Sequence, residues 1–118
     1  MKRARNRRYD FFLKQMLTAM DNILQYTGNL CYDTFTGNNM VKDAVIRNFE
    51  ILGEGVKHIP FSFQNRHKAI PWSQMLMLRN FIVHEFFDID DEILWEIIRT
   101  DLTRNRDDMR LIINDINT

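Results

Sequence analysis

The strongest chemical pattern in this sequence is the pair Arg79 and His84, an arginine followed five residues later by a histidine. Histidine exchanges a proton near neutral pH, and a guanidinium stabilises the negative charge that develops on a phosphate in a transition state. This combination predicts phosphodiester chemistry. It suits RNA in particular, because the 2′-OH of RNA is itself the nucleophile and no metal ion is then required.

The geometry of a helix limits what one copy of this pair can do. Five residues turn a helix by about 140° beyond a full circle, so Arg79 and His84 converge poorly within one chain. A two-fold axis beside their helix would let two arginines and two histidines line one shared cleft. The helix is also apolar nearly all round, with Met77 and Phe81 on the face of His84. We therefore expect it to be buried on several sides, and we expect a homodimer driven by the burial of this apolar surface.

Both residues also have a structural interpretation. A buried guanidinium requires a partner, and a carboxylate from the preceding long helix, Glu50 or Glu54, would satisfy Arg79 inside the fold. If neither glutamate pairs with Arg79, the charged face of the preceding helix, which carries both of them, is expected to form weak surface ion pairs. A lone histidine on a mostly apolar helix is most often a hydrogen-bonded core residue, which is the alternative for His84.

The sequence offers no convincing metal site or cofactor motif. His58 and His67 are separated by Pro60 and have no ligand-like spacing to His84, so we expect chemistry without a metal or a cofactor. The single cysteine, Cys31, excludes an internal disulfide framework and fits a reducing compartment. No stretch approaches the roughly 20 apolar residues of a membrane helix. We therefore expect a cytoplasmic protein.

Charge is balanced over the whole chain, with 16 basic and 16 acidic residues. A near-zero net charge does not predict nucleic-acid binding, so an anionic partner would have to be attracted by a local patch. Residues 1–8 contain five basic side chains, those of Lys2, Arg3, Arg5, Arg7 and Arg8. This segment is expected to be a solvated tail, with contact to RNA phosphates or to an acidic partner as alternatives.

The elements that must position the pair are predicted to be helices, because only four glycines and two prolines interrupt the 118 residues. Apolar spacing, capping residues and prolines predict five helices, at about residues 9–27, 39–59, 71–87, 91–102 and 106–116. Asn38 or Asn39 is the expected cap of the second helix. The stretch through Phe35 is expected to be irregular or briefly helical, and the segment from Phe61 to Ala69 is expected to be a loop or a single turn. The pattern predicts an all-α, antiparallel helical bundle formed by one domain over residues 1–118.

The third of these helices carries Arg79 in the middle of an apolar arc, which is formed by Met75, Leu78, Ile82 and Phe86. Residues 79–86, RNFIVHEF, resemble the HEPN motif, in which an arginine, a polar residue, three variable residues and a histidine are followed by any residue and a tyrosine. Residues 43–54 (DAVIRNFEILGE), 70–72 (IPW) and 91–98 (DEILWEII) resemble the HepT-type version of that family. The resemblance covers nearly the whole chain after Tyr9.

This resemblance implies a homodimeric HEPN-type bundle and a toxin of a toxin–antitoxin system, paired with a minimal nucleotidyltransferase as antitoxin. The toxin would cut RNA, such as tRNA or mRNA, in a cleft at the dimer interface without a metal ion. Arg79 and His84 would be its catalytic pair. Asn80 matches the polar position after the arginine, where it would orient His84 across one helical turn or hold a phosphate.

One departure from the family pattern affects regulation. Phe86 stands where the family has the tyrosine that the antitoxin modifies with AMP, and phenylalanine has no hydroxyl to modify. Silencing by adenylylation at this position is then impossible, and control must come from complex formation or from another residue. Met77 and Asp88, which stand where the family usually has glycine, are expected to narrow the cleft or alter the turn after the helix.

Two other functions compete with a ribonuclease. Some relatives of this family resemble non-catalytic companions of nucleotidyltransferases, and in such a protein the same cleft would hold a nucleotide or another substrate without cleaving it. The third interpretation is a helical dimerisation protein in which Arg79 and His84 are purely structural.

Overall fold

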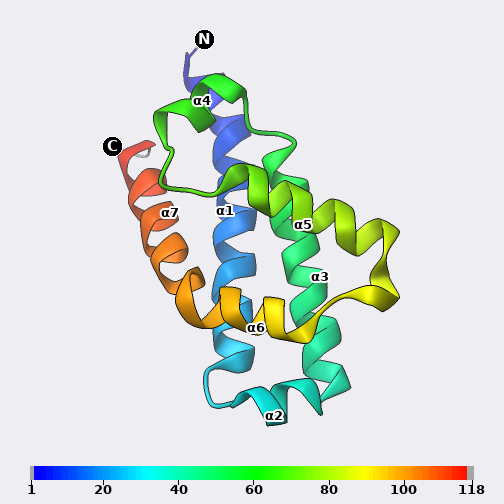
Figure 1. The fold of residues 1–118 in the computed structure, drawn as a ribbon. Helices are drawn as coiled ribbons and strands as arrows, with labels where there is room; N and C mark the ends of the chain where they lie inside the picture. Colours follow the sequence, from blue (N-terminus) through cyan, green and yellow to red (C-terminus); the bar gives the residue numbers. More distant parts are fainter. Residues whose placement is uncertain (1, 117–118) are drawn as a thin grey trace.

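The computed structural model describes residues 2–116, with side chains from Tyr9 onward, and every regular element in that part of the chain is a helix. The predicted all-α class is confirmed (Figure 1). The α-helices are α1 (Lys2–Thr27), α2 (Tyr32–Thr36), α3 (Asn39–Val56), α4 (Phe61–Arg66), α5 (Trp72–His84), α6 (Asp91–Thr100) and α7 (Leu102–Ile116). A short 3-10 helix, η1 (Phe86–Asp88), lies between α5 and α6.

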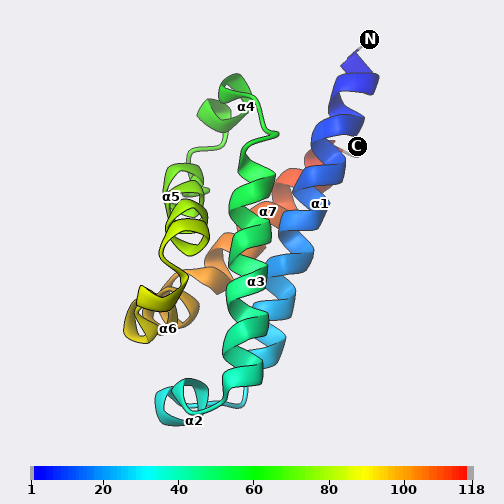
Figure 2. The same ribbon diagram turned by 90° about the vertical axis from the view of Figure 1, so that its right-hand side faces the viewer.

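Helix α3 lies at the centre of the arrangement. It runs antiparallel to α1, and the two helices lie side by side in both views (Figures 1 and 2). Helix α5 packs on the opposite side of α3, where it crosses that helix obliquely, and α7 packs against α1. The helix that carries Arg79 is therefore positioned mainly by its contact with α3.

The core forms where the apolar faces of α1 and α3 meet. On α1 these are Leu13, Met16, Met20 and Ile23, and on α3 they are Val45, Phe49, Leu52 and Val56, all of which are buried. The predicted cap of α3 is confirmed, because the side chain of Asn38 accepts a hydrogen bond of 3.1 Å from the backbone N–H of Val41. Asp90 caps α6 in the same way through the N–H of Glu92.

Several predicted boundaries are wrong, among them the end of the second helix, because α3 ends at Val56 and not at residue 59. Helix α1 begins at Lys2, so the backbone of the basic segment expected as a tail is helical, as its arginines and alanine favour. Helix α7 begins at Leu102 instead of near Arg106. Pro71 stands at the position just before α5 and is not the first residue of that helix. None of the helices in the described part of the chain is long and apolar enough to cross a membrane.

The end of α5 is the correction that matters for the chemistry. The helix was predicted to continue to Phe87, but it ends at His84, and Glu85 leaves the helical region at φ −133° and ψ 44°. The partial negative charge at the end of a helix disfavours the acidic residues that follow here, Glu85, Asp88 and Asp90. As a result Phe86 lies outside the apolar arc of α5, and 46% of its surface is exposed.

Two glycines of α3 allow its neighbours to approach closely. A Cβ added to Gly53 would lie 2.1 Å from the Cβ of Arg79 and 2.7 Å from the carbonyl oxygen of Met75, both on α5. A Cβ added to Gly55 would lie 2.5 Å from the Cγ of Met16 on α1. Helix α3 therefore contacts α5 through one glycine and α1 through the other, and Glu54 lies between them in the sequence.

The Gly53→Ala substitution is expected to lower the free energy of unfolding by about 1–3 kcal/mol, because overpacking against backbone outweighs the gain of about 1 kcal/mol in helix propensity. Urea unfolding followed by circular dichroism measures this loss. Gly37→Ala is the control, since the nearest atom to its added Cβ outside its chain neighbours is the carbonyl oxygen of Asp33 at 3.2 Å, compared with 2.1 Å at Gly53. A Gly53→Ala protein as stable as the parent would contradict the close approach of α5 to α3.

Candidate active site

Arg79 projects from α5 onto α3 and is largely buried, with 20% of its side chain exposed. Its Nε donates a hydrogen bond of 2.7 Å to Oε2 of Glu54, and its Nη1 donates one of 2.9 Å to Oδ1 of Asn80. The carboxylate expected for this arginine is therefore Glu54. Glu50, the other candidate, pairs with Arg47 at 3.0 Å.

The contact at Gly53 explains why Arg79 reaches this carboxylate. Because Gly53 has no side chain, the stem of Arg79 lies directly on the backbone of α3, beside the next residue, Glu54. A guanidinium has five N–H donors, and the hydrogen bonds among the described residues occupy two of them. The ion pair thus fixes the guanidinium in place and leaves donors for an anionic ligand.

His84 is the last residue of α5 and is exposed. Within residues 9–116, no hydrogen bond or ion pair involves its ring. The interpretation of His84 as a hydrogen-bonded core residue is therefore wrong. A ring with both nitrogens open to solvent can exchange protons with a substrate that reaches the end of α5.

Asn80 follows Arg79 on the exposed side of α5. Its side-chain oxygen accepts the hydrogen bond from Arg79, and among the described residues no hydrogen bond joins it to His84. In this chain Asn80 thus steadies the arginine and leaves the histidine unconstrained. Its amide nitrogen is still available to a phosphate.

Arg79 and His84 do not contact each other within the chain. Arg79 is held against α3, whereas His84 lies free at the end of the helix. The expectation that α5 is buried on several sides is wrong for the single chain, because Met77, Phe81 and Val83 are 68%, 43% and 45% exposed. One chain therefore presents the two groups separately, beside an uncovered apolar surface.

Two of the three residues that depart from the family pattern, Phe86 and Asp88, lie at this same end of α5, and Met77 lies in the middle of the helix. Phe86 begins η1 two residues after His84, and its ring packs edge-on against Phe87 with 5.5 Å between centroids. Phe87 is 96% exposed. Asp88 ends η1 and is exposed as well, so all three side chains extend the surface around His84.

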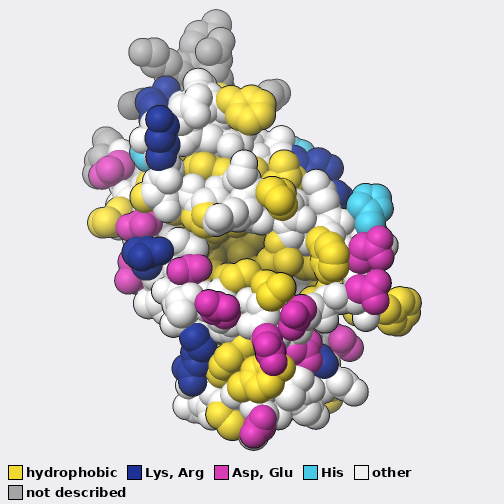
Figure 3. All heavy atoms as spheres, in the orientation of Figure 1, with side chains coloured by type: hydrophobic (Ala, Val, Ile, Leu, Met, Phe, Trp, Pro, Cys, Tyr) yellow, Lys and Arg dark blue, Asp and Glu magenta, His cyan; other side chains and the backbone are white. Residues whose placement is uncertain are grey.

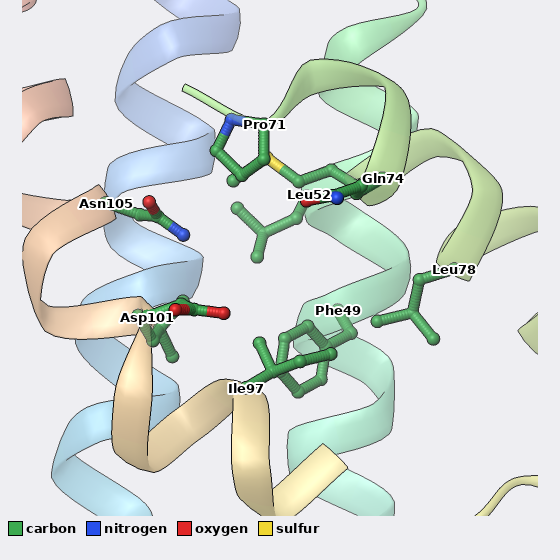
Figure 4. Close-up of a pocket in the computed structure, with 10 residues that line it drawn as sticks. Phe49, Leu52, Pro71, Gln74, Leu78, Ile97, Asp101 and Asn105 are labelled. Carbon is green, nitrogen blue, oxygen red and sulfur yellow. The ribbon is translucent and has the colours of Figure 1, made fainter. Parts of the chain in front are cut away.

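A small cavity lies elsewhere in the fold. It has a volume of about 60 Å³ and is surrounded by residues of α3, α5, α6 and α7, including Leu52, Leu78, Ile97 and Asn105 (Figure 4). Ligand pockets usually measure about 300–1,000 Å³, so this cavity is too small for a nucleotide, and neither Arg79 nor His84 lines it.

On the surface, apolar side chains gather in the hollow between α5 and α6, with acidic side chains along α6 (Figure 3).

Within the described residues, no group of three or more His, Cys, Asp or Glu side chains is arranged to hold a metal ion. Cys31, the single cysteine, is exposed. The candidate site therefore consists of the Arg79–Glu54 pair, Asn80 and His84. Glu54 was one of two sequence candidates, and Gly53 was missed, although a glycine inside an amphipathic helix is a signal of close packing.

The electrostatics of the site centre on Glu54. Burial alone would raise the pKa of this carboxyl, but the charges of Arg79 and Lys57 outweigh that effect and hold the pKa below its ordinary value of 4.5. Lys57 contributes from 3.6 Å. A lowered pKa means that the ion pair stabilises the fold fully above pH 4.5, and that this contribution is lost as the pH falls through the folded-state value.

We therefore expect Glu54→Gln to destabilise the protein at neutral pH and to do so progressively less below pH 4.5, where the parent also loses the charge. Urea unfolding over this pH range measures the difference between the two proteins. Glu96→Gln, at an exposed position of α6, is the control for removing one negative charge. A difference that stays constant with pH would show that the Glu54 charge does not hold Arg79.

Comparison with known proteins places the chain in a family. Residues 16–116 match the family model described as "Ribonuclease HepT-like". Two similar proteins of Methanocaldococcus jannaschii, each named a "Putative RNase", are 32% identical over 86% of this chain and 93% of the relative, and 34% identical over 89% and 87%. A "Probable ribonuclease HepT" of Thermococcus cleftensis is 33% identical over 77% of this chain and 83% of its own length. No solved structure matches significantly. The family match covers most of the chain, which therefore belongs to the HepT-like ribonuclease family.

Proposed function

We propose that this chain is the toxin of a toxin–antitoxin pair and that it cleaves RNA, such as tRNA or mRNA, in the cytoplasm without a metal ion. The observation that carries the proposal is the state of the two motif residues on α5. Glu54 holds Arg79 in place and leaves N–H donors of its guanidinium free. His84 is exposed and has no partner among the described residues. A phosphate-binding cation and a free proton carrier are the two groups that this chemistry requires.

The reaction uses the 2′-OH of the substrate as nucleophile. His84 takes the proton from this hydroxyl while the 2′-oxygen attacks the adjacent phosphorus. The bond from phosphorus to the 5′-oxygen of the next nucleotide breaks, and the same ring returns a proton to that oxygen. The products are a 2′,3′-cyclic phosphate and a 5′-OH end. Arg79 stabilises the charge on the phosphorane, and Asn80 keeps the guanidinium oriented.

A homodimer completes the site in this proposal. A two-fold axis beside α5 would set His84 of one copy next to Arg79 of its partner and form two equivalent sites in one cleft. The exposed apolar side chains of α5 support this arrangement, because Met77, Phe81 and Val83 would be covered by the second copy. Phe87, at 96% exposed, lies at the same end of the helix.

The partner that restrains the toxin is proposed to be a nucleotidyltransferase-type antitoxin. Transfer of AMP requires a hydroxyl acceptor, and Phe86 provides none. The exposed ring of Phe86 instead offers the antitoxin an apolar contact beside His84, so control by complex formation is favoured over modification at this position.

The test is cleavage of a mixed tRNA and mRNA pool in EDTA by the parent chain and by Arg79→Ala and His84→Ala. Each substitution is expected to reduce the rate by about 10²–10⁴-fold, because one removes charge stabilisation and the other the proton carrier. Arg104→Ala is the control, since this arginine is 71% exposed on α7, away from the site. Circular dichroism checks that all variants are folded.

No cleavage by the parent in EDTA or with added divalent ions would contradict the proposal. If the parent then bound a nucleotide tightly, and Arg79→Ala abolished that binding, the chain would be the non-catalytic companion of a nucleotidyltransferase. Loss of folding in both alanine variants would favour a structural role for the pair.

A further inference from the structure

A groove of about 330 Å³ runs between α1 and α3, on the side of α3 that carries Glu54. Its walls include Phe11, Phe12 and Gln15 from α1, together with Arg47 and Glu54 from α3 and His58 just after it. This volume lies within the usual range for ligand sites, unlike the small cavity under α5. The two helices that form the groove lie side by side in Figure 2.

The aromatic side chains of the groove pack against one another. The rings of Phe12 and His58 are parallel within 5°, with 4.0 Å between centroids. Phe11 meets Phe12 edge-on at 5.2 Å and an interplanar angle of 87°. Phe11 is 57% exposed, so an aromatic ring at the mouth of the groove is uncovered.

The groove is joined to the candidate active site through one residue. Glu54 lines the groove and is also the hydrogen-bond partner of Arg79. If a phosphate of an RNA strand bound to the free donors of Arg79, a neighbouring nucleotide of the same strand would therefore lie at the mouth of the groove. Arg47 also lies on the groove wall, where it is 67% exposed and forms an ion pair of 3.0 Å with Glu50, another residue that lines the groove.

We propose, resting on the ribonuclease function above, that this groove is a subsite for one unpaired base of the RNA strand that reaches Arg79, with the base stacked on Phe11. Single-stranded RNA is commonly held by stacking its bases on aromatic side chains, and stacking tolerates any base because each has a π-face. The side-chain amide of Gln15 offers both a donor and an acceptor to the edge of the base. The groove thus contributes affinity and position, and Arg79 and His84 supply the chemistry.

The test measures binding of a fluorescent single-stranded 2′-O-methyl RNA, which cannot be cleaved because its 2′-oxygen carries no proton. Phe11→Ala is expected to weaken binding by about 5- to 150-fold, as the loss of one base–aromatic stack implies. Phe11→Tyr is expected to bind like the parent, since it retains a ring. Phe61→Ala is the matched control, because Phe61 is 80% exposed on α4 and does not line the groove.

Equal affinities for Phe11→Ala and Phe61→Ala would overturn the subsite, and so would a parent that binds no strand at all. Light scattering that shows a change of oligomeric state in Phe11→Ala alone would also overturn it, since a second copy would then cover the groove. Failure of the ribonuclease function is distinguishable. If the parent cleaves no RNA but its binding depends on Phe11, the subsite stands and the catalytic proposal fails. If the parent cleaves RNA normally and its binding does not depend on Phe11, the catalytic proposal stands and the subsite fails.

Discussion

The ion pair between Arg79 and Glu54 depends on one close helix contact, and the candidate site depends on that pair. Helix α5 rests on the backbone of α3 at Gly53, so the stem of Arg79 lies where any larger residue would place its own side chain. Leaving a largely buried guanidinium unpaired would cost several kcal/mol, and Glu54, the next residue, meets that need at 2.7 Å. Gly55 brings α1 against the other side of α3. Arg79 is thereby held directly by α3, and α3 is packed in turn against α1.

This arrangement divides the chemistry between a fixed group and a free one. Arg79 is oriented by Glu54 and Asn80 before any substrate arrives, as transition-state stabilisation by a cation requires. His84 lies five residues later, at the point where the helix ends, and is not held by any described residue. Under the proposed function, a single chain would therefore offer a pre-oriented cation for the phosphate, but its proton carrier would still have to be positioned. The uncovered apolar face of α5 is the surface through which a second copy would supply the missing half.

Local pattern predicted much of this fold and part of the site. Periodicity identified the buried faces of α1 and α3, and the caps at Asn38 and Asp90 follow from side-chain chemistry that acts within one turn. The end of α5 was not predicted, because Phe86 continues the apolar spacing although the acidic residues around it disfavour a longer helix. Periodicity could narrow the partner of Arg79 to Glu50 or Glu54 but could not choose between them. That choice depends on the close contact of α5 with α3 at Gly53, and the sequence pattern of a single helix carries no information about a contact between helices.

The central claim, that each site combines Arg79 of one copy with His84 of its partner, is tested by mixing two inactive chains. Arg79→Ala and His84→Ala chains are co-expressed so that their subunits combine at random, and cleavage of RNA in EDTA is compared with that of each variant alone. Half of the dimers are then mixed and each holds one intact site, so the mixture should recover about a quarter of the parent activity. Recovery near that level would establish the shared site. A mixture that forms mixed dimers and still cleaves nothing would contradict it.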